Sequence, residues 1–284
     1  MRSLLSILLF FPILSHAAVI YDTLHINNGY HNTFDGENIE FLSFNSSSTF
    51  EVKNSRVEIG IGDSLYLTIY NNDSITHGID ITNTTGYSTT VAAGGTVTIP
   101  TLFTSQEVHV IYDPLNYPNS TYLGLGTMLI VDDFSLTGKF YWNIKEFRDD
   151  WNDSIVNSNS VPWNLYYPNY FILNGASNPD INDDPDARVT GSVGDTLRIY
   201  MANTGQSVHS FHFHGYHCKI VNYSKKPSHV GRDKDTFPMY SLDTYILELI
   251  PQQEGEYPVH DHNLVALTGG NVFPMGIMLT ILIE

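Results

Sequence analysis

The histidines of the C-terminal half are the residues whose types and spacing most directly suggest chemistry. Residues 209–218 read HSFHFHGYHC, and a second pair, His260 and His262, stands in the block GEYPVHDH. Residues two apart in an extended strand point to the same face, so His212 and His214 project together, as do His260 and His262. Two such strands side by side would bring four imidazoles to one place. Neutral imidazole suits copper, zinc, nickel and iron, and among divalent ions copper binds nitrogen ligands most tightly.

The alternative interpretation is that these are ordinary surface or structural histidines. A single His-x-His pair would favour that interpretation. Here each of two pairs stands near the turn-rich end of a predicted strand, which favours a metal site.

The elements that must position these histidines are predicted to be strands. Short β-rich runs such as 64–70 (SLYLTIY) and 245–250 (YILELI) are separated by Gly, Asn, Asp and Pro. No long segment shows a clean apolar period of 3.6 residues. Regular short strands with turn signals between them are typical of an all-β sandwich or barrel.

The chain also repeats itself. Residues 60–71 (GIGDSLYLTIYN) parallel residues 192–203 (SVGDTLRIYMAN), and each copy is followed by a His-Gly pair, His77-Gly78 and His214-Gly215. Each half then closes with a similar strand, GTMLIV in the first and GIMLTI in the second. Two copies of one β-unit in the same order predict two similar domains. We place them at residues 18–140 and 141–284.

The first residues predict secretion. Residues 1–17 have a positive start, a short apolar run and small residues before a cleavage site after Ala17, as in a signal peptide. The alternative is a buried N-terminal strand. We expect an extracellular protein, or a periplasmic one in a Gram-negative bacterium. Six Asn-x-Ser/Thr triplets are possible glycan acceptors, although such triplets arise easily by chance; they begin at Asn45, Asn72, Asn83, Asn119, Asn152 and Asn222.

The charge of the chain excludes several partners. A formal net charge of −17 argues against nucleic acid and anionic membranes and favours cations. The acidic stretch 178–186 (NPDINDDPD) could hold calcium or form a solvated turn, and its lack of ordered carboxylate spacing favours the turn. The one cysteine, Cys218, excludes an intrachain disulfide.

The histidine segments carry a family resemblance. The run HSFHFHG at residues 209–215 resembles the His-Pro-x-His-x-His-Gly motif of multicopper oxidases. GEYPVHDH, with Gly269-Gly270 and Met275-Gly276 after it, resembles the terminal His-Cys-His block of that family. Residues 170–175 (YFILNG) resemble the segment that opens a later domain. The resemblance implies two tandem Greek-key cupredoxin-like sandwich domains, copper as cofactor, and a ring-shaped homotrimer with copper between subunits.

The resemblance also assigns roles to single residues. His212 and His214 correspond to ligands of the type 2/type 3 copper cluster, and His260 and His262 to ligands of the type 3 pair. His209 corresponds to the type 1 histidine. From the N-terminal half, His77 is the fifth expected cluster ligand, since the matching pair there is Ile75 and His77.

The sequence departs from the family pattern at the type 1 site. The family's cysteine is replaced by Asp261, and its second type 1 histidine by Ala266, while Met275 reaches the axial position only with an insertion. Cys218 could substitute as the thiolate or could be a small buried hydrophobe, which is the usual role of a free cysteine. The N-terminal half has His109 but no His-Cys-His block. We therefore expect fewer coppers than a complete trinuclear cluster.

Three functions follow from this pattern. The first is a copper-dependent oxidoreductase that takes electrons from phenols, metal ions or another small donor and passes them to dioxygen, with Asp261 or Asp113 as a proton relay. The second is a non-catalytic extracellular protein for copper binding, storage or delivery. The third is a structural glycoprotein on a cupredoxin scaffold. In relatives such as copper nitrite reductase, a mononuclear histidine site lies between subunits. A copper site between subunits is therefore a further possibility for this chain.

Overall fold

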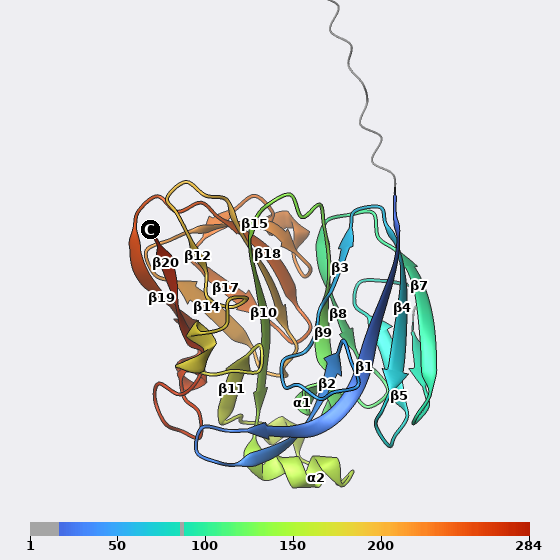
Figure 1. The fold of residues 1–284 in the computed structure, drawn as a ribbon. Helices are drawn as coiled ribbons and strands as arrows, with labels where there is room; N and C mark the ends of the chain where they lie inside the picture. The colour runs from blue at the N-terminus through green and yellow to red at the C-terminus, as the bar shows by residue number, and fades with distance from the viewer. Residues whose placement is uncertain (1–16, 86–87) are drawn as a thin grey trace, which may run out of the picture.

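The protein is built from two pairs of β-sheets that follow one another along the chain (Figure 1). A computed structural model describes residues 17–85 and 88–284. Except for Ala17, the predicted signal peptide lies outside these residues and stays a prediction. No helix among the described residues is long and apolar enough to span a membrane.

The first half of the chain forms two sheets around one core. One sheet has the strand order β2-β1-β4-β7 and the other β3-β9-β8-β5-β6. Their strands are β1 (Val19–Asn32), β2 (Asn38–Asn45), β3 (Val57–Gly60), β4 (Ser64–Asn71), β5 (His77–Ile81), β6 (Thr89–Val91), β7 (Thr96–Leu102), β8 (Glu107–Tyr112) and β9 (Gly126–Asp132). Alternating side chains of β4, such as Leu65 and Leu67, are fully buried, because successive residues of a strand face opposite sides.

The second half repeats this plan. Its sheets have the orders β11-β10-β13-β18-β15-β16 and β12-β20-β19-β14-β17. Their strands are β10 (Gly138–Phe147), β11 (Tyr170–Leu173), β12 (Thr190–Gly191), β13 (Leu197–Asn203), β14 (His209–Phe213), β15 (Cys218–Tyr223), β16 (Asp233–Lys234), β17 (Thr236–Met239), β18 (Thr244–Leu249), β19 (Gly255–Asp261) and β20 (Met278–Ile283). The predicted domain boundary after residue 140 lies three residues into β10.

The helices are short and lie in connections. They are α1 (Asn119–Tyr122), α2 (Asn152–Val156) and the 3-10 helices η1 (Asp149–Trp151), η2 (Trp163–Leu165), η3 (Asp180–Asn182), η4 (Pro227–His229) and η5 (Leu264–Leu267).

The two halves correspond strand by strand. The order β2-β1-β4-β7 matches β11-β10-β13-β18, and β3-β9-β8-β5-β6 matches β12-β20-β19-β14-β17. In both halves the first long strand runs parallel to the strand of the repeated segment, β1 to β4 and β10 to β13. The internal repeat seen in the sequence is therefore a repeat of the fold.

The halves pack against each other through a shared apolar layer. Val108 and Ile130 from the first half lie in one cluster with Tyr200 and Ile246 from the second. The Thr244 hydroxyl crosses this boundary and donates to the Val108 carbonyl at 2.8 Å. Figure 1 shows β8 and β9 lying beside β10 and β18 along this boundary.

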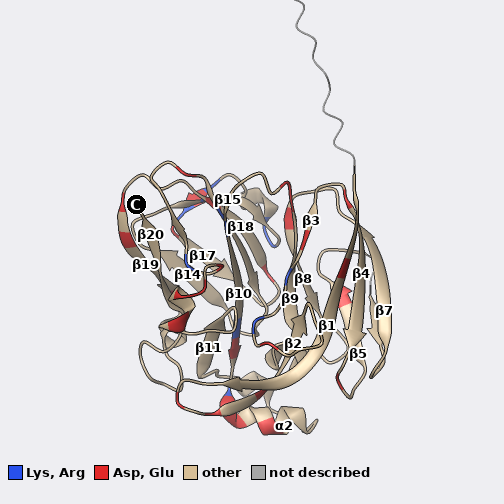
Figure 2. Cartoon of the chain, viewed as in Figure 1, with Lys and Arg blue, Asp and Glu red and all other residues tan. Residues whose placement is uncertain are grey.

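The acidic stretch 178–186 forms ion pairs between the halves. Lys53 Nζ lies 2.8 Å from an Asp184 oxygen and 2.7 Å from an Asp186 oxygen, and Arg56 also bonds to Asp186 at 3.1 Å. Side-chain cations of the first half thus occupy two of the four carboxylates that the sequence offered for calcium, those of Asp184 and Asp186. Elsewhere carboxylates far outnumber lysines and arginines (Figure 2).

Two of the predicted glycan acceptors are unsuited to carry a glycan in the folded protein. Asn45 and Asn152 are buried, and their amide groups donate to the Glu51 and Glu40 carbonyls.

One buried asparagine in each half fixes the turn that leads to the next strand. The Asn203 amide donates to the Ser207 and Met239 carbonyls at 2.8 and 3.1 Å, and its oxygen accepts from Gly205 N at 3.0 Å. Asn71 makes the same kind of bonds in the first half. Each asparagine stands six residues before the first residue of a strand, His77 in β5 and His209 in β14.

We expect Asn203→Ala to lower the free energy of unfolding by about 2 to 4 kcal/mol, because buried backbone groups lose their partners. Urea unfolding would measure this. Asn159→Ala, at an exposed loop position, is the control and should change the free energy by less than about 0.5 kcal/mol. Equal stability of the two variants would contradict the positioning role of Asn203.

Candidate metal centre

Two neighbouring strands bring the four predicted histidines together. His212 on β14 pairs directly with His260 on β19, while His214 and His262 follow the ends of these strands. The ring centroids of His212 and His214 are 4.7 Å apart, those of His212 and His262 5.0 Å, and those of His214 and His260 5.0 Å. His214 and His262 are exposed, and the other two are half-buried. The strand periodicity therefore placed these four residues correctly.

The closest ring nitrogens have the spacing of two ligands of one ion. His214 Nε2 and His260 Nε2 lie 3.0 Å apart. Two nitrogens that bind one ion at about 2.0 Å and at 90 to 110° to each other are separated by about 2.8 to 3.3 Å. Among residues 17–85 and 88–284, no three His, Cys, Asp or Glu side chains form a complete ligand set. A metal would thus find one pair already spaced for binding, and further imidazoles would have to turn toward it.

Hydrogen bonds to the far ring nitrogen orient two of these imidazoles. His212 Nδ1 donates to Thr236 Oγ1 at 3.0 Å, and that hydroxyl donates to Asp235 Oδ1 at 3.0 Å. His260 Nδ1 donates to the Asp261 carbonyl at 3.0 Å. In both cases the ring lone pair is on Nε2, as is common in metal-binding histidines. The lone pair of His260 accepts a hydrogen bond from His214 Nε2 at 3.0 Å, and metal binding would displace that proton.

The charge state of His214 suits metal binding. Desolvation and the neighbouring imidazoles lower the pKa of His214 below its usual value. An imidazole must be neutral to bind a metal, so a lowered pKa keeps the ligand available at neutral pH.

His209, expected at the type 1 position, lies in a buried ion triad. Its Nδ1 donates to Asp261 Oδ2 at 2.5 Å and its Nε2 to Glu146 Oε2 at 3.0 Å, and all three side chains are fully buried. Burial alone would lower the pKa of His209, but hydrogen bonds and charge from Asp261 and Glu146 raise it to about 9. Both ring nitrogens carry protons at neutral pH, so His209 has no lone pair for a metal.

Asp261 also ties together the ends of the two strands. Its Oδ1 accepts from Ser210 N at 2.9 Å and from Asn263 N at 2.8 Å, while Oδ2 bonds to His209. These partners saturate a side chain that has no exposed surface. The geometry favours a structural role for Asp261 over the expected proton relay.

Glu146 is a member of the triad that sequence reasoning missed. It lies on β10 and also accepts from the backbone of Gln206 and Ser207, at 2.6 and 2.8 Å, and from the Tyr166 hydroxyl at 3.3 Å. No pattern within β10 singled out Glu146, because that strand also contains Lys139, Asn143 and Lys145.

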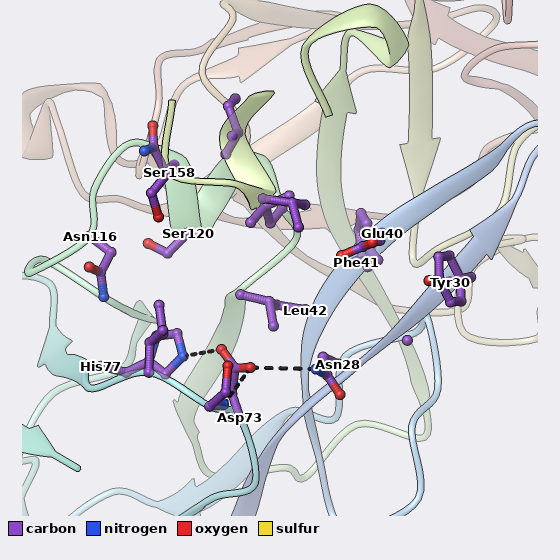
Figure 3. Close-up of a pocket in the computed structure, with 17 residues that line it drawn as sticks. Asn28, Tyr30, Glu40, Phe41, Leu42, Asp73, His77, Asn116, Ser120 and Ser158 are labelled. Atoms are coloured by element: carbon purple, nitrogen blue, oxygen red, sulfur yellow. Dashed lines mark hydrogen bonds and ion pairs between the residues drawn. The ribbon is translucent and has the colours of Figure 1, made fainter. Parts of the chain in front are cut away.

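The N-terminal half contains the same triad. His77 Nδ1 donates to Asp113 at 2.8 Å and its Nε2 to Asp73 at 2.9 Å (Figure 3 shows the bond to Asp73). Asp113 Oδ1 accepts from Gly78 N and Leu115 N, as Asp261 does from Ser210 N and Asn263 N. These carboxylates raise the pKa of His77 to about 9, against the effect of burial. His77, like His209, is therefore unavailable as a ligand, and Asp113 is as enclosed as Asp261.

The repeat must therefore be aligned differently from the sequence prediction. The strand pairs Phe211↔Asp261 and Asp80↔Tyr112 make His77 the first-half equivalent of His209, not of His214. The predicted match of Ile75 and His77 with His212 and His214 is therefore wrong. The first-half equivalents of the four clustered histidines are Asp80, Thr82, Tyr112 and Pro114. The shared His-Gly dipeptide misled the alignment, whereas the six-residue turn from the buried asparagine fixes it.

The remaining candidates lie outside the cluster. Cys218 begins β15 and is fully buried in the core of the second half, which raises its thiol pKa. Ala266 is buried in the same core. His109 is buried in the first half and donates from Nδ1 to the Thr82 carbonyl at 2.7 Å.

Comparison with known proteins agrees with this arrangement. Residues 155–276 match the family model described as multicopper oxidase. This part of the chain is therefore similar to a multicopper oxidase domain. The matched segment contains the four-histidine cluster and two members of the His209 triad. No curated protein matches the sequence.

Solved structures share the fold over nearly the whole chain. The blue copper oxidase from Nitrosomonas europaea aligns with a TM-score of 0.79 at 18% identity, covering 94% of this chain and 86% of that one. The multicopper oxidase mgLAC aligns with a TM-score of 0.79 at 18% identity, covering 94% of this chain and 87% of that one. The copper nitrite reductase from Nitrosomonas europaea aligns with a TM-score of 0.73 at 18% identity, covering 94% of both chains. The chain thus has the two-domain cupredoxin-like fold of multicopper oxidases, as its sequence predicted.

Removing one carboxylate of the triad tests its ionisation. The pKa of His209 in the folded state is raised from 6.5 to about 9. Its contribution to the free energy of unfolding is therefore complete below pH 6.5 and is lost as the pH rises through 9. We expect Asp261→Asn to lower the free energy of unfolding by about 3 to 5 kcal/mol at pH 6, with a smaller difference at pH 10.

Urea unfolding of both proteins at pH 6, 8 and 10 would measure this difference. Burial lowers the pKa of Lys145 to about 7, which acts in the opposite direction, but both proteins contain it. The exposed Asp180→Asn is the control. A difference that stays constant with pH would contradict a charged His209.

Thr236→Val should release His212 from its fixed tautomer. Loss of such a partner typically costs ten- to 100-fold in metal affinity, so we expect Cu(II) affinity to fall by about tenfold. Competition with a chelator would measure it. The exposed Thr190→Val, on a strand of the same sheet, should leave the affinity unchanged. Equal affinities of the two variants would refute the role of Thr236.

Proposed function

We propose that the protein is a copper-dependent oxidoreductase that binds copper through His212, His214, His260 and His262 and uses no type 1 copper. The observation that carries this proposal is the convergence of the four imidazoles, with two Nε2 atoms 3.0 Å apart. An all-imidazole donor set without thiolate suits Cu(II), and the similar solved structures are named as copper enzymes.

The route of electrons in this proposal differs from that of a blue copper enzyme. Copper would supply the redox chemistry, accepting electrons from a donor and passing them to dioxygen. The His209–Asp261 pair occupies the position from which a type 1 copper would feed the cluster. The donor must therefore reach the cluster directly. The exposed His214 and His262 leave it open to a small phenol or a metal ion.

The number of coppers in the proposed site is one or two. In a homotrimer of the kind found among two-domain relatives, the first half of one copy would face the cluster of the next. That half offers Asp80 and Tyr112 where the second half has His212 and His260. It adds no imidazole from the equivalent positions, so a complete trinuclear cluster is not proposed.

The proposed compartment is extracellular. The leader-like residues 1–17 support secretion, and the single buried cysteine needs no reducing environment. The acidic surface would also favour approach of metal cations.

A non-catalytic copper carrier is the second candidate. The observation that favours it is the closed triad in both halves, because neither type 1 position is left for an electron-transfer metal. Oxygen consumption by the copper-loaded protein with phenol or Fe(II) donors separates the two candidates. Turnover supports the oxidoreductase, and copper binding without turnover with any donor supports the carrier.

We expect His212→Ala and His260→Ala each to abolish stoichiometric copper loading, because each removes half of one histidine pair. Metal analysis and electron paramagnetic resonance of the purified chain would measure loading. His229→Ala, which removes an imidazole outside the cluster, should load normally. Neither the wild type nor the variants should show an intense blue band, since no thiolate can reach the cluster. Normal loading of both cluster variants would sink the proposed site.

A further inference from the structure

The first half contains a cavity that the copper proposal leaves unused. It has a volume of about 360 Å³, within the range of small-molecule sites, and opens beside the His77 triad (Figure 3). Its lining combines polar residues, here called the polar wall, which include Asn28, Asp73 and Asn116, with apolar residues, here called the apolar wall, which include Leu42 and Ile155.

The cavity exists because the second carboxylate of the triad comes from a different segment in each half. The strand pairs Ile26↔Asn71 and Ile144↔Asn203 make Asn28 the equivalent of Glu146. In the second half, Glu146 reaches His209 itself, and Gly205 has no Cβ because one would clash with that carboxylate. In the first half, Asp73 stands at the Gly205 position and bonds to His77, and the shorter Asn28 leaves space.

The polar wall includes two amide oxygens that can accept hydrogen bonds, those of Asn28 and Asn116. The Asn28 amide donates to Asp73 at 3.4 Å, and the Asn116 amide donates to the Thr76 carbonyl and to Asp113. Among the described residues, neither amide oxygen accepts a hydrogen bond. A ligand that donates hydrogen bonds is therefore complementary to this wall.

The residues around the cavity carry net negative charge. Glu40 lines it and has no ion-pair or side-chain hydrogen-bond partner among the described residues. Asp73 and Asp113 together carry one more negative charge than the single imidazolium between them. No lysine or arginine is among the lining residues. A cation entering the cavity would meet uncompensated negative charge.

We propose that this cavity binds a small organic ammonium ion, a primary amine with a hydrocarbon or aromatic body. The ammonium group donates to the carboxylate of Glu40. The body packs against the apolar wall around Leu42 and Ile155. A hydrated metal ion would leave that apolar wall unfilled, and an anion would be repelled by the carboxylates.

Isothermal titration calorimetry on the metal-free protein at pH 7 tests the proposal independently of copper. The probe is 2-phenylethylammonium, and 2-phenylethanol is its neutral analogue of the same shape. We expect the ammonium ion to bind at least about tenfold more tightly than the alcohol, because a charge-assisted hydrogen bond is replaced by a neutral one.

Two variants locate the site. Glu40→Gln should weaken binding of 2-phenylethylammonium by about tenfold, since the carboxylate becomes a neutral amide of the same size. Glu37→Gln removes the same charge from an exposed position outside the lining and should leave the affinity within about twofold. Equal losses in both variants, equal affinity for amine and alcohol, or no heat of binding at millimolar amine would overturn the proposal.

Discussion

The need to pair a buried charge governs the structure of both halves. An imidazolium taken out of water is costly unless carboxylates bind both of its nitrogens, and such an arrangement tolerates little change in geometry. His209 meets this need with Asp261 at the end of β19 and Glu146 on β10, so one ion joins three strands. Because Asp261 also binds two backbone amides, the ends of β14 and β19 are held at one fixed register.

That register determines what lies on the neighbouring face. Asp261 points into the core, so the residues on either side of it, His260 and His262, must point out of it. The same alternation puts His212 beside His260 across the pair of strands. One buried side chain therefore both occupies the position where the family resemblance expects the type 1 cysteine and presents imidazoles on the other face. Closing one site and presenting the other are consequences of a single residue.

Local patterns in the sequence predicted the strands, the duplication and the four clustered histidines, because each depends on alternation or on spacing within one segment. The roles of His209 and His77 depended on partners far along the chain. Glu146 is 63 residues from His209, and no local pattern links them. The alignment of the repeat failed for a related reason: a shared dipeptide was matched, whereas Asn71 and Asn203 determine where the next strand begins.

The placement of Cys218 has a consequence for durability. A redox metal at an exposed site produces partly reduced oxygen species, and thiolates are the side chains most readily oxidised. The single thiol of this chain has no exposed surface, and burial raises its pKa, so almost no thiolate forms. Because the chain has no disulfide and its one thiol is buried, oxidants formed at the surface would not disrupt the fold through cysteine chemistry.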